Sequence, residues 1–546
     1  MSENRMMKVF FFAMCTGILM GLAWPTKGFT WLIFVGFVPL LWAVERWIEE
    51  TRKRKFFCLF ASAYSAFFLW NAITVCWLHY AQHPDGSYAW EAYIPPVVLN
   101  ALLMTVIFLL YTWARKRLGK KLGQLFLLCL WISFEKLHFE WEFAWPWLNL
   151  GNGLADHNRW IQWYEYTGSL GGSLWVLLVN LGFFNAFERY RNTWNRMALY
   201  KNLSLNLGLI IIPIGISYWI YDCYEEKGPE FEFVVLQPNV DPYANKYSTS
   251  SGELAQQLTR LAQSSITDRT SFVLAPETSL PGYGRIRIRD LEYNSGVILL
   301  KNYLRKHPQL AFIMGIELYD EYTTREVAGE SATFIPKINR WIDVFNSAML
   351  IDASDNLQIY HKSKLVPGVE IFPYKRIFEP LLGNLLLDFG GTVMGHSYKI
   401  ASLMLECPKI GINIAPIICY ESVFGEYVSQ SVLNGAQYIC ILTNDAWWAT
   451  SEGHKQHFAY ARLRAIENRR SIARSANTGV SAFIDQRGDV IASLPYGEEG
   501  GIRCSIQANN EKTFYTLYGD VIARVALFLG GILFSYALAH QFIGRN

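Results

Sequence analysis

The stretch Ile414-Ala-Pro-Ile-Ile-Cys-Tyr-Glu-Ser-Val-Phe-Gly-Glu426 decides the fold of the C-terminal part of this chain. Apolar residues fill most positions before Cys419, and Gly411 bounds the run, which is the pattern of a buried β-strand. Residues 421–433 place apolar side chains three and four positions apart, which predicts a helix. The sequence therefore predicts that Cys419 lies where a strand ends and a helix begins.

Cys419 at such a junction is a candidate nucleophile. The unpaired N–H groups and the positive end of a helix dipole lower the pKa of a nearby thiol, and the thiolate is the form that attacks. The alternative is an inert cysteine in the core, because free cysteine is among the residue types most often buried. The other residues of the same domain decide between the two interpretations.

Strands and helices alternate around this stretch through residues 228–512. The predicted strands are Glu232–Asn239, Ser271–Glu277, Leu310–Glu317, 344–352, 356–361, Tyr438–Leu442, 471–476 and 480–485. Further helices are predicted at 251–265, 289–305 and 454–467. The alternation predicts a layered α/β fold with helices outside a sheet, in which catalytic groups gather where strands end.

The composition divides the chain into two parts. Hydrophobic residues make up 52% of its 546 residues, and they are concentrated in the long apolar runs of residues 1–225. A net charge of +3 argues against nucleic acid as a partner. The nine cysteines are spread singly, without the spacing of a zinc site or a disulfide framework. We expect no metal and no cofactor, and no disulfide to Cys419.

Apolar runs long enough to cross a membrane recur along the chain. They lie at 8–24, 29–45, 56–79, 90–114, 122–138, 160–187, 203–222 and 520–543. The chain is therefore expected to have three parts, a seven-span bundle at 1–225, an extracytoplasmic domain at 228–512 and a C-terminal span at 520–543. Glu135 and Lys136 lie near the end of the fifth run, where polar residues often cap a span at the interface.

Basic residues predict the orientation of these spans. They cluster after the second, fourth and sixth runs, at 46–55, 115–121 and 189–201, whereas the loops after the first, third and fifth runs hold almost none. Positively charged loops stay in the cytoplasm. The predicted topology has the N-terminus inside and residues 228–512 on the outer side of the membrane.

The outer loop between the fifth and sixth runs is rich in aromatic residues, as Phe139-Glu-Trp-Glu-Phe-Ala-Trp-Pro-Trp-Leu-Asn149 shows. Trp gathers at bilayer interfaces for reasons of solvation alone. A functional interpretation is a lip that guides a lipid toward the outer domain.

Three predicted strand ends carry polar groups that together can transfer an acyl group. Glu277, Lys362 and Cys419 supply a general base, a cation for an oxyanion and a nucleophile. Each residue alone is weak evidence, because a glutamate or lysine at a strand end is usually only solvated. Lys364 shares a strand face with Lys362, so alternation does not choose between them.

The motifs around these residues resemble a known superfamily. Pro276-Glu277, Lys362-x-Lys-Leu-Val-Pro367 with Glu370, and Cys419-Tyr-Glu421 resemble the Glu-Lys-Cys motif of the nitrilase, or carbon–nitrogen hydrolase, superfamily. Thr443-Asn-Asp-Ala-Trp447 and Arg462-x-Arg-Ala-Ile-Glu-Asn-Arg469 add to the resemblance. With the membrane bundle and the trailing span, the whole chain resembles the apolipoprotein N-acyltransferase family, whose catalytic domain is a nitrilase-like α/β sandwich.

The resemblance implies a two-step reaction. Cys419 would take an acyl chain from a phospholipid, typically phosphatidylethanolamine, as a thioester, and the N-terminal amine of S-diacylglyceryl-cysteine in a lipoprotein would then accept it. It further implies Glu277 as general base, Lys362 as oxyanion stabiliser and Glu370 and Glu421 as supporting carboxylates. The substrate-binding residues that it implies are Tyr420, Asn444 and Trp447. It also implies a multi-pass protein of a bacterial inner membrane with its catalytic domain on the periplasmic side.

The chain departs from the family pattern in two places. The loop Val366-Pro-Gly-Val-Glu370 replaces the usual Val-Pro-Phe-Gly-Glu, and only Tyr247, beside Lys246, could substitute for the family's tryptophan after the first strand. Two other functions remain open, a membrane-anchored amidase or nitrilase for a small soluble amide, and a lipid-binding scaffold with an inert domain. Eight spans argue against the first, and intact Glu277, Lys362 and Cys419 argue against the second.

Overall fold

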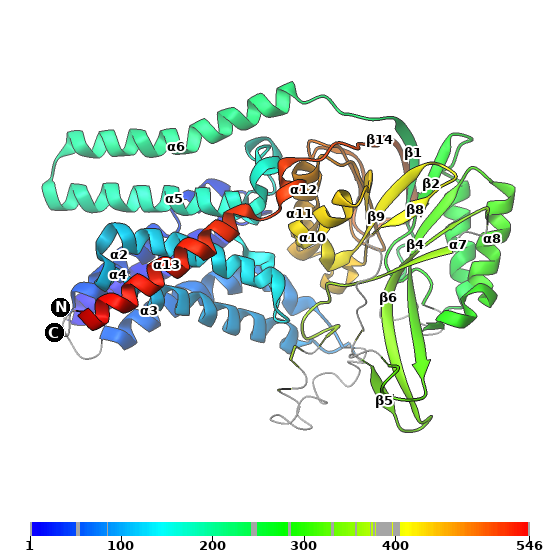
Figure 1. Cartoon of the computed structure of the whole chain (residues 1–546), viewed down its shortest axis with the longest axis horizontal. Coiled ribbons are helices and arrows are strands. Elements are labelled where there is room, and N and C mark those ends of the chain that lie inside the picture. Colours follow the sequence, from blue (N-terminus) through cyan, green and yellow to red (C-terminus); the bar gives the residue numbers. More distant parts are fainter. Residues whose placement is uncertain are drawn as a thin grey trace. The chain divides into compact units, whose positions relative to one another are not determined.

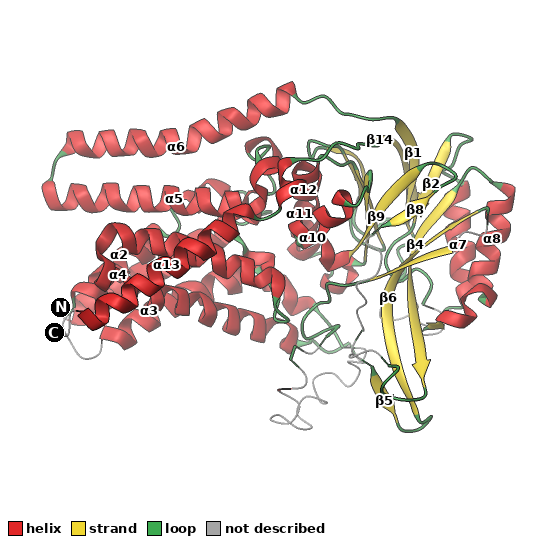
Figure 2. Cartoon of the chain, in the orientation of Figure 1, coloured by secondary structure: helices red, strands yellow, loops and turns green. Residues whose placement is uncertain are grey.

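The computed structural model describes residues 3–50, 55–83, 86–241, 248–281, 285–328, 332–354, 357–371, 373–374, 377, 396 and 404–543. The chain forms two compact units. One consists of Met1–His79, Trp90–Cys223 and Tyr518–Asn546, and the other of Tyr80–Ala89 and Tyr224–Leu517. The first unit is helical, and the named strands all belong to the second (Figure 2).

The helical unit contains the apolar runs. Its helices are α1 (Glu3–Ala23), α2 (Val38–Glu49), α3 (Lys55–Thr74), α4 (Trp90–Glu140), α5 (Tyr164–Thr193), α6 (Arg196–Cys223) and α13 (Val521–Ile543) (Figure 1). Among the described residues, seven helical segments are long and apolar enough to cross a membrane. One of them is the 51-residue α4, which covers the predicted spans at 90–114 and 122–138. Gly119 divides α4, because its backbone angles of φ 74° and ψ 179° are not helical.

Polar contacts tie the helices of this unit together. Arg115 of α4 forms an ion pair of 3.0 Å with Glu45 of α2, and Lys136 of α4 forms one of 3.1 Å with Asp520, which directly precedes α13. The C-terminal helix α13 is joined to the bundle in two ways. One is the ion pair of Lys136 with Asp520, and the other is the packing of Leu533 near Phe126.

The side chain of Glu135 is buried in the helical unit, whereas its sequence position suggests a polar residue that caps a span at the interface. One carboxylate oxygen accepts hydrogen bonds from the Trp131 indole at 2.8 Å and from the backbone N–H of Leu150 at 2.8 Å. Trp147 is also buried, and its ring packs on Trp77 with the ring centroids 4.9 Å apart. The aromatic loop is thus packed into the helical unit at Trp147. The lipid-guiding lip remains a prediction.

The second unit contains two sheets. Among the described residues, the larger has eight strands, β1 (Glu230–Gln237), β2 (Thr270–Leu274), β3 (Ile286–Arg287), β4 (Ala311–Tyr322), β5 (Thr333–Ile335), β6 (Arg340–Asp352), β7 (Leu357–His361) and β14 (Gly500–Gln507). The smaller has the order β13-β12-β11-β10-β9-β8, with β8 (Leu405–Cys407), β9 (Ile412–Ile418), β10 (Tyr438–Thr443), β11 (Ile472–Ala476), β12 (Ser481–Ile484) and β13 (Val490–Leu494).

Three cores show that the unit is a four-layer sandwich. Side chains of both sheets, such as Phe272 of β2 and Tyr438 of β10, share the central core. The outer face of the larger sheet packs against α7 (Ser251–Gln263) and α8 (Ser295–Lys306), which lie side by side in Figure 1. The outer face of the smaller sheet packs against α10 (Gly425–Leu433) and α11 (Glu452–Asn468). The predicted layered α/β fold is confirmed, with two sheets where the alternation alone predicted one.

Candidate active site

Four strands of the two sheets end at the same site. Glu277 follows β2, Lys362 follows β7 directly, Cys419 follows β9 directly and Asn444 follows β10 directly. Side chains alternate along a strand, and Tyr360 of β7, Ile418 of β9 and Leu442 of β10 all pack in the central core between the sheets. Lys362 and Asn444, each two positions further on, therefore belong to the face between the sheets.

Lys362 is held between two carboxylates. Its Nζ lies 2.8 Å from Oε1 of Glu370 and 3.3 Å from Oε1 of Glu277, and its side chain is 1% exposed. Asn346 of β6 donates through Nδ2 to the same two oxygens, at 2.7 Å to Glu277 and 3.2 Å to Glu370. The structure thus brings together three of the residues that the sequence predicts. Lys364 lies elsewhere, with its Nζ 5.2 Å from the centre of the Phe424 ring.

The charges of this cluster reinforce each other. Burial opposes the ammonium of Lys362, but the carboxylates of Glu370 and Glu277 outweigh burial and raise the pKa of Lys362. Burial likewise opposes the Glu370 carboxylate, but the charges of Lys362 and His396 and the hydrogen bonds from Lys362 and Val366 together outweigh burial. The pKa of Glu370 therefore falls below its ordinary value. Lys362 is therefore a fixed cation at the strand ends.

The altered loop at 366–370 still delivers Glu370 to Lys362. Gly368 has φ 79°, a left-handed conformation that favours glycine. The backbone N–H of Glu370 donates to the carbonyl of Val366 at 2.9 Å, and the N–H of Val366 donates to Oε2 of Glu370 at 2.8 Å. The turn therefore fixes both the backbone and the side chain of Glu370.

Cys419 lies on a strained turn. Its φ of 50° is unusual for a residue with a Cβ. Its carbonyl oxygen is 3.1 Å from Nε2 of His457 and accepts a hydrogen bond of 2.8 Å from the Ser422 hydroxyl. Nδ1 of His457 lies 3.0 Å from Asp445, which binds Arg474 at 2.8 Å. This buried network holds the turn that carries the thiol.

The environment of the thiol corrects the expectation of a lowered pKa. Burial, followed by the negative charge of Glu277, raises the pKa of Cys419, and only the smaller effects of Lys362 and of a hydrogen bond with Thr443 act in the opposite direction. The α-helix predicted at 421–433 begins later than predicted. A 3₁₀ segment spans Cys419–Val423, and α10 begins at Gly425. The resting thiol is therefore protonated and needs a base.

Glu421 joins the two loops that carry Lys362 and Cys419. Its Oε1 accepts from the Tyr360 hydroxyl at 2.6 Å and from the backbone N–H of Ser363 at 2.7 Å. Its Oε2 accepts from the N–H of Ile418 at 2.8 Å. Burial raises the pKa of Glu421. Its contacts are those of a carboxylate that fixes backbone next to the reacting groups.

The predicted substrate-binding residues lie in different settings. Tyr420 is buried, and its ring lies in a T-shaped arrangement with the ring of Phe424, with the ring centroids 5.2 Å apart. Trp447 is half-buried in the 3₁₀ segment Asp445–Trp448. Asn444 is 1% exposed, and its Oδ1 accepts from Nδ2 of Asn477 at 3.2 Å. Tyr247 and Lys246 lie outside the described residues.

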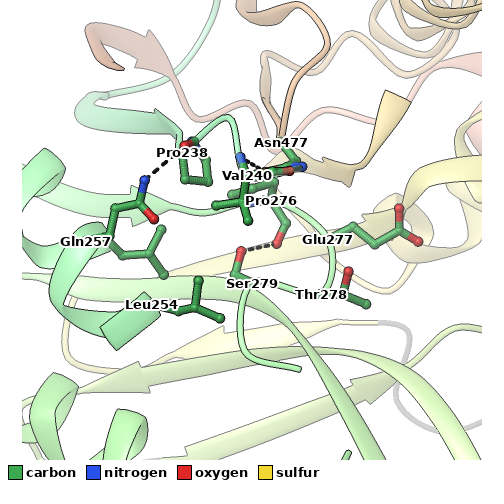
Figure 3. Close-up of a pocket in the computed structure, with 10 residues that line it drawn as sticks. Pro238, Val240, Leu254, Gln257, Pro276, Glu277, Thr278, Ser279 and Asn477 are labelled. Atoms are coloured by element: carbon green, nitrogen blue, oxygen red, sulfur yellow. Dashed lines mark hydrogen bonds between the residues drawn. The ribbon is translucent and has the colours of Figure 1, made fainter. Parts of the chain in front are cut away.

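A small pocket lies behind Glu277. Its lining includes Val240, Pro276, Ser279 and Asn477 together with Glu277 itself. Figure 3 shows the Glu277 side chain directed away from these residues, so that its backbone, and not its carboxylate, borders the pocket. The carboxylate instead meets Lys362 and Asn346.

Sequence reasoning missed Asn346, His457 and Arg474. Asn346 lies inside the 13-residue strand β6, and an asparagine at such a position carries no motif of its own. Asp445 belongs to the Thr443–Trp447 motif, but its partners His457 and Arg474 come from α11 and β11. Only the fold brings these residues together.

Comparisons with known proteins cover nearly the whole chain. Residues 16–182 match the apolipoprotein N-acyltransferase N-terminal domain, and residues 235–514 match the carbon-nitrogen hydrolase family. The apolipoprotein N-acyltransferase of Chlorobaculum tepidum is 28% identical over 536 residues, 96% of each chain. Those of Geobacter metallireducens and Thermotoga maritima are each 26% identical, covering 94% and 95% of this chain and 92% and 93% of their own.

Proposed function

We propose that this chain, which belongs to the apolipoprotein N-acyltransferase family of carbon–nitrogen hydrolases, transfers a fatty acyl chain from a phospholipid to a lipoprotein. The acceptor is the N-terminal α-amino group of S-diacylglyceryl-cysteine, and phosphatidylethanolamine is the proposed donor. The observation that carries this proposal is the burial of Lys362 between Glu277 and Glu370, at the strand ends where Cys419 also lies.

In the first step, Glu277 removes the proton of the Cys419 thiol, whose raised pKa makes a base necessary. The sulfur attacks the ester carbonyl of the phospholipid, and Lys362 stabilises the negative oxygen that forms. The C–O bond then breaks, and Glu277 returns the proton to the departing lysophospholipid. The product is an acyl thioester on Cys419.

In the second step, the α-amino group attacks the thioester carbonyl. Glu277 takes a proton from the attacking amine, Lys362 again stabilises the oxyanion, and the C–S bond breaks. The thiol of Cys419 is restored with that proton, and an amide is formed. Glu370 and Asn346 hold Lys362 and Glu277 in place, and Glu421 keeps the Lys362 and Cys419 loops together.

The chemistry requires lipids to reach the catalytic domain. We propose a membrane part at 1–225 and 520–543 and a catalytic domain at 228–512 on the periplasmic side of the bacterial inner membrane. The apolar helices and the clusters of basic residues support this orientation. Tyr420 and Trp447 are the proposed contacts of the acyl chain or head group.

Mass spectrometry of the purified full chain tests the proposal. Incubation with phosphatidylethanolamine alone is expected to add one acyl mass to the Cys419 peptide and to release lysophospholipid, whereas Cys419→Ala gains nothing. A diacylated lipopeptide added next is expected to remove the label and to gain one acyl chain. Turnover of a small soluble amide, with no label on Cys419 from phospholipid, would favour the amidase, and wild-type function in Cys419→Ala would favour the scaffold.

A further inference from the structure

Asn444 presents a buried hydrogen-bond donor with no partner among the residues that the structure describes. Its Nδ2 has no hydrogen bond to any described residue, although the residue is 1% exposed. A buried polar group without a partner costs about 1–3 kcal/mol, so such atoms in native proteins call for an explanation. A bound ligand that supplies the missing acceptor is one such explanation.

Neighbouring hydrogen bonds fix which end of the Asn444 amide lacks a partner. Asn477 accepts from the backbone N–H of Val240 at 3.1 Å and donates through Nδ2 to the carbonyl of Val240 at 2.7 Å. These two backbone groups set the orientation of the Asn477 amide. Its Nδ2 also faces Asn444 at 3.2 Å, so the facing atom of Asn444 must be the oxygen. The remaining atom is therefore the NH₂ group, a donor.

The fold places Asn444 at the end of β10, beside the end of β9 that carries Cys419. Asn444 follows β10 directly, and Leu442, two residues earlier, packs between the sheets. Its neighbour Asn477 lines the pocket that the backbone of Glu277 also borders (Figure 3). The register pairs Leu442 with Ile418, the residue before Cys419, so the ends of β9 and β10 are adjacent.

We infer that the Nδ2 group of Asn444 donates a hydrogen bond to the acyl carbonyl oxygen that is bound at Cys419, as a second oxyanion donor beside Lys362. This inference rests on the proposed function and deepens it. A neutral donor suits the position, because the amide needs no counter-ion when the site is empty. The same carbonyl oxygen becomes negative when the thioester forms and again when the amine attacks, so Asn444 serves both steps.

The test separates the two half-reactions. Single-turnover rates of thioester formation are measured on the full chain with phosphatidylethanolamine alone, and rates of acyl transfer are measured from the preformed thioester to a diacylated lipopeptide. Asn444→Ala is expected to slow both by about 100-fold or more, as expected on loss of one oxyanion donor, with KM for phospholipid little changed. Asn444→Asp keeps the acceptor for Asn477 and places an oxygen where the donor was, so it is expected to be at least as slow.

The controls separate folding and the proposed function from this inference. Asn468→Ala removes another buried amide, whose Nδ2 donates to Arg464 within α11, and is expected to retain near wild-type rates in both half-reactions if folded. Because Asn444→Ala could fail to fold, the isosteric Asn444→Asp is measured with it. The melting temperature of each variant is measured as a check of folding and is expected to lie near that of the wild type. A loss in only one half-reaction, a change in KM alone or no loss would overturn the inference. Absence of a thioester in the wild type would instead overturn the proposed function.

Discussion

The Cys419 thiol is protonated at rest because burial and the carboxylate of Glu277 both oppose a negative charge on sulfur. The proposed general base is thus also a group that disfavours a negative charge on the proposed nucleophile. Lys362 acts in the opposite sense, since its positive charge favours the thiolate. At this scale, removal of either charge should move the thiol pKa in a known direction.

The thiol titration gives a first prediction. Glu277→Gln removes a negative charge, so the pKa of Cys419 should fall and alkylation of Cys419 by iodoacetamide should be faster than in the wild type at a given pH. Acyl transfer should nevertheless drop by at least 100-fold, because the variant lacks the proposed general base. Peptide mass spectrometry over a range of pH follows Cys419 apart from the other eight cysteines. Slower alkylation of Glu277→Gln would contradict the assigned charge effect.

A second residue-level prediction concerns Glu370 and acid. Its pKa in the folded chain lies below the ordinary value of 4.5, so the ionised side chain adds stability above that value and the contribution is lost as the pH falls further. Glu370→Gln should lower stability at pH 7 by about 2 kcal/mol, the scale of a hydrogen bond to a charged group. Thermal melting at pH 7 and pH 3.5 measures this difference, which should shrink in acid. A constant difference would contradict the role of the charge.

Two turns at the candidate active site have left-handed backbone angles. Cys419 has φ 50°, and Gly368, in the loop before Glu370, has φ 79°. A Cβ at Gly368 would have no heavy atom of any described residue within 4 Å. The requirement for glycine there is therefore one of backbone conformation.

That requirement is testable by substitution. Gly368→Val should cost at least about 1–2 kcal/mol, because a β-branched residue strongly disfavours left-handed backbone, and should lower activity by displacing Glu370. Gly368→Asn is the matched control, since asparagine tolerates this conformation and is expected to retain most activity. Rates of thioester formation and melting temperatures of both variants decide the matter. Equal losses in Gly368→Val and Gly368→Asn would show that the lack of room for a side chain, and not the backbone angle, explains the need for glycine.

The elements also show which features could be predicted from sequence. Apolar periodicity located β9, α7 and α11, because it reflects burial that is local to one strand or helix. Motif spacing selected Glu277 and Lys362, which the structure places 3.3 Å apart. Asn346 and His457 could not be found in this way, because their contacts depend on which strands and helices become neighbours. The prediction of a lowered pKa for the Cys419 thiol was wrong for the same reason, because this pKa depends on burial by segments that are distant in the sequence.

At the scale of the whole molecule, the membrane spans and the catalytic domain must be consistent with one topology. The basic residues predict that the turn between α5 and α6 faces the cytoplasm and that residues 228–512 face the periplasm. Asn192 and Asp268 are exposed positions, one near that turn and one in the second unit.

Single cysteines at these positions test the orientation. In a background whose exposed native cysteines are replaced, Asp268→Cys should react with a membrane-impermeant maleimide in intact spheroplasts, whereas Asn192→Cys should react only after lysis. Gel-shift labelling measures both. Protection of Asp268→Cys in intact spheroplasts would place the catalytic domain in the cytoplasm and would remove the basis for a periplasmic lipoprotein acceptor.

The ion pair between Asp445 and Arg474 has a consequence for how the sequence can drift. Both side chains are fully buried, and loss of one partner of such a pair costs about 3–5 kcal/mol because the other charge is stranded away from water. Substitution of either residue alone should therefore remove a large part of the free energy of unfolding, which is about 5–15 kcal/mol for a typical domain. We expect the two positions, which are 29 residues apart, to co-vary among homologues. A homologue that lacks the aspartate is expected to lack the arginine as well.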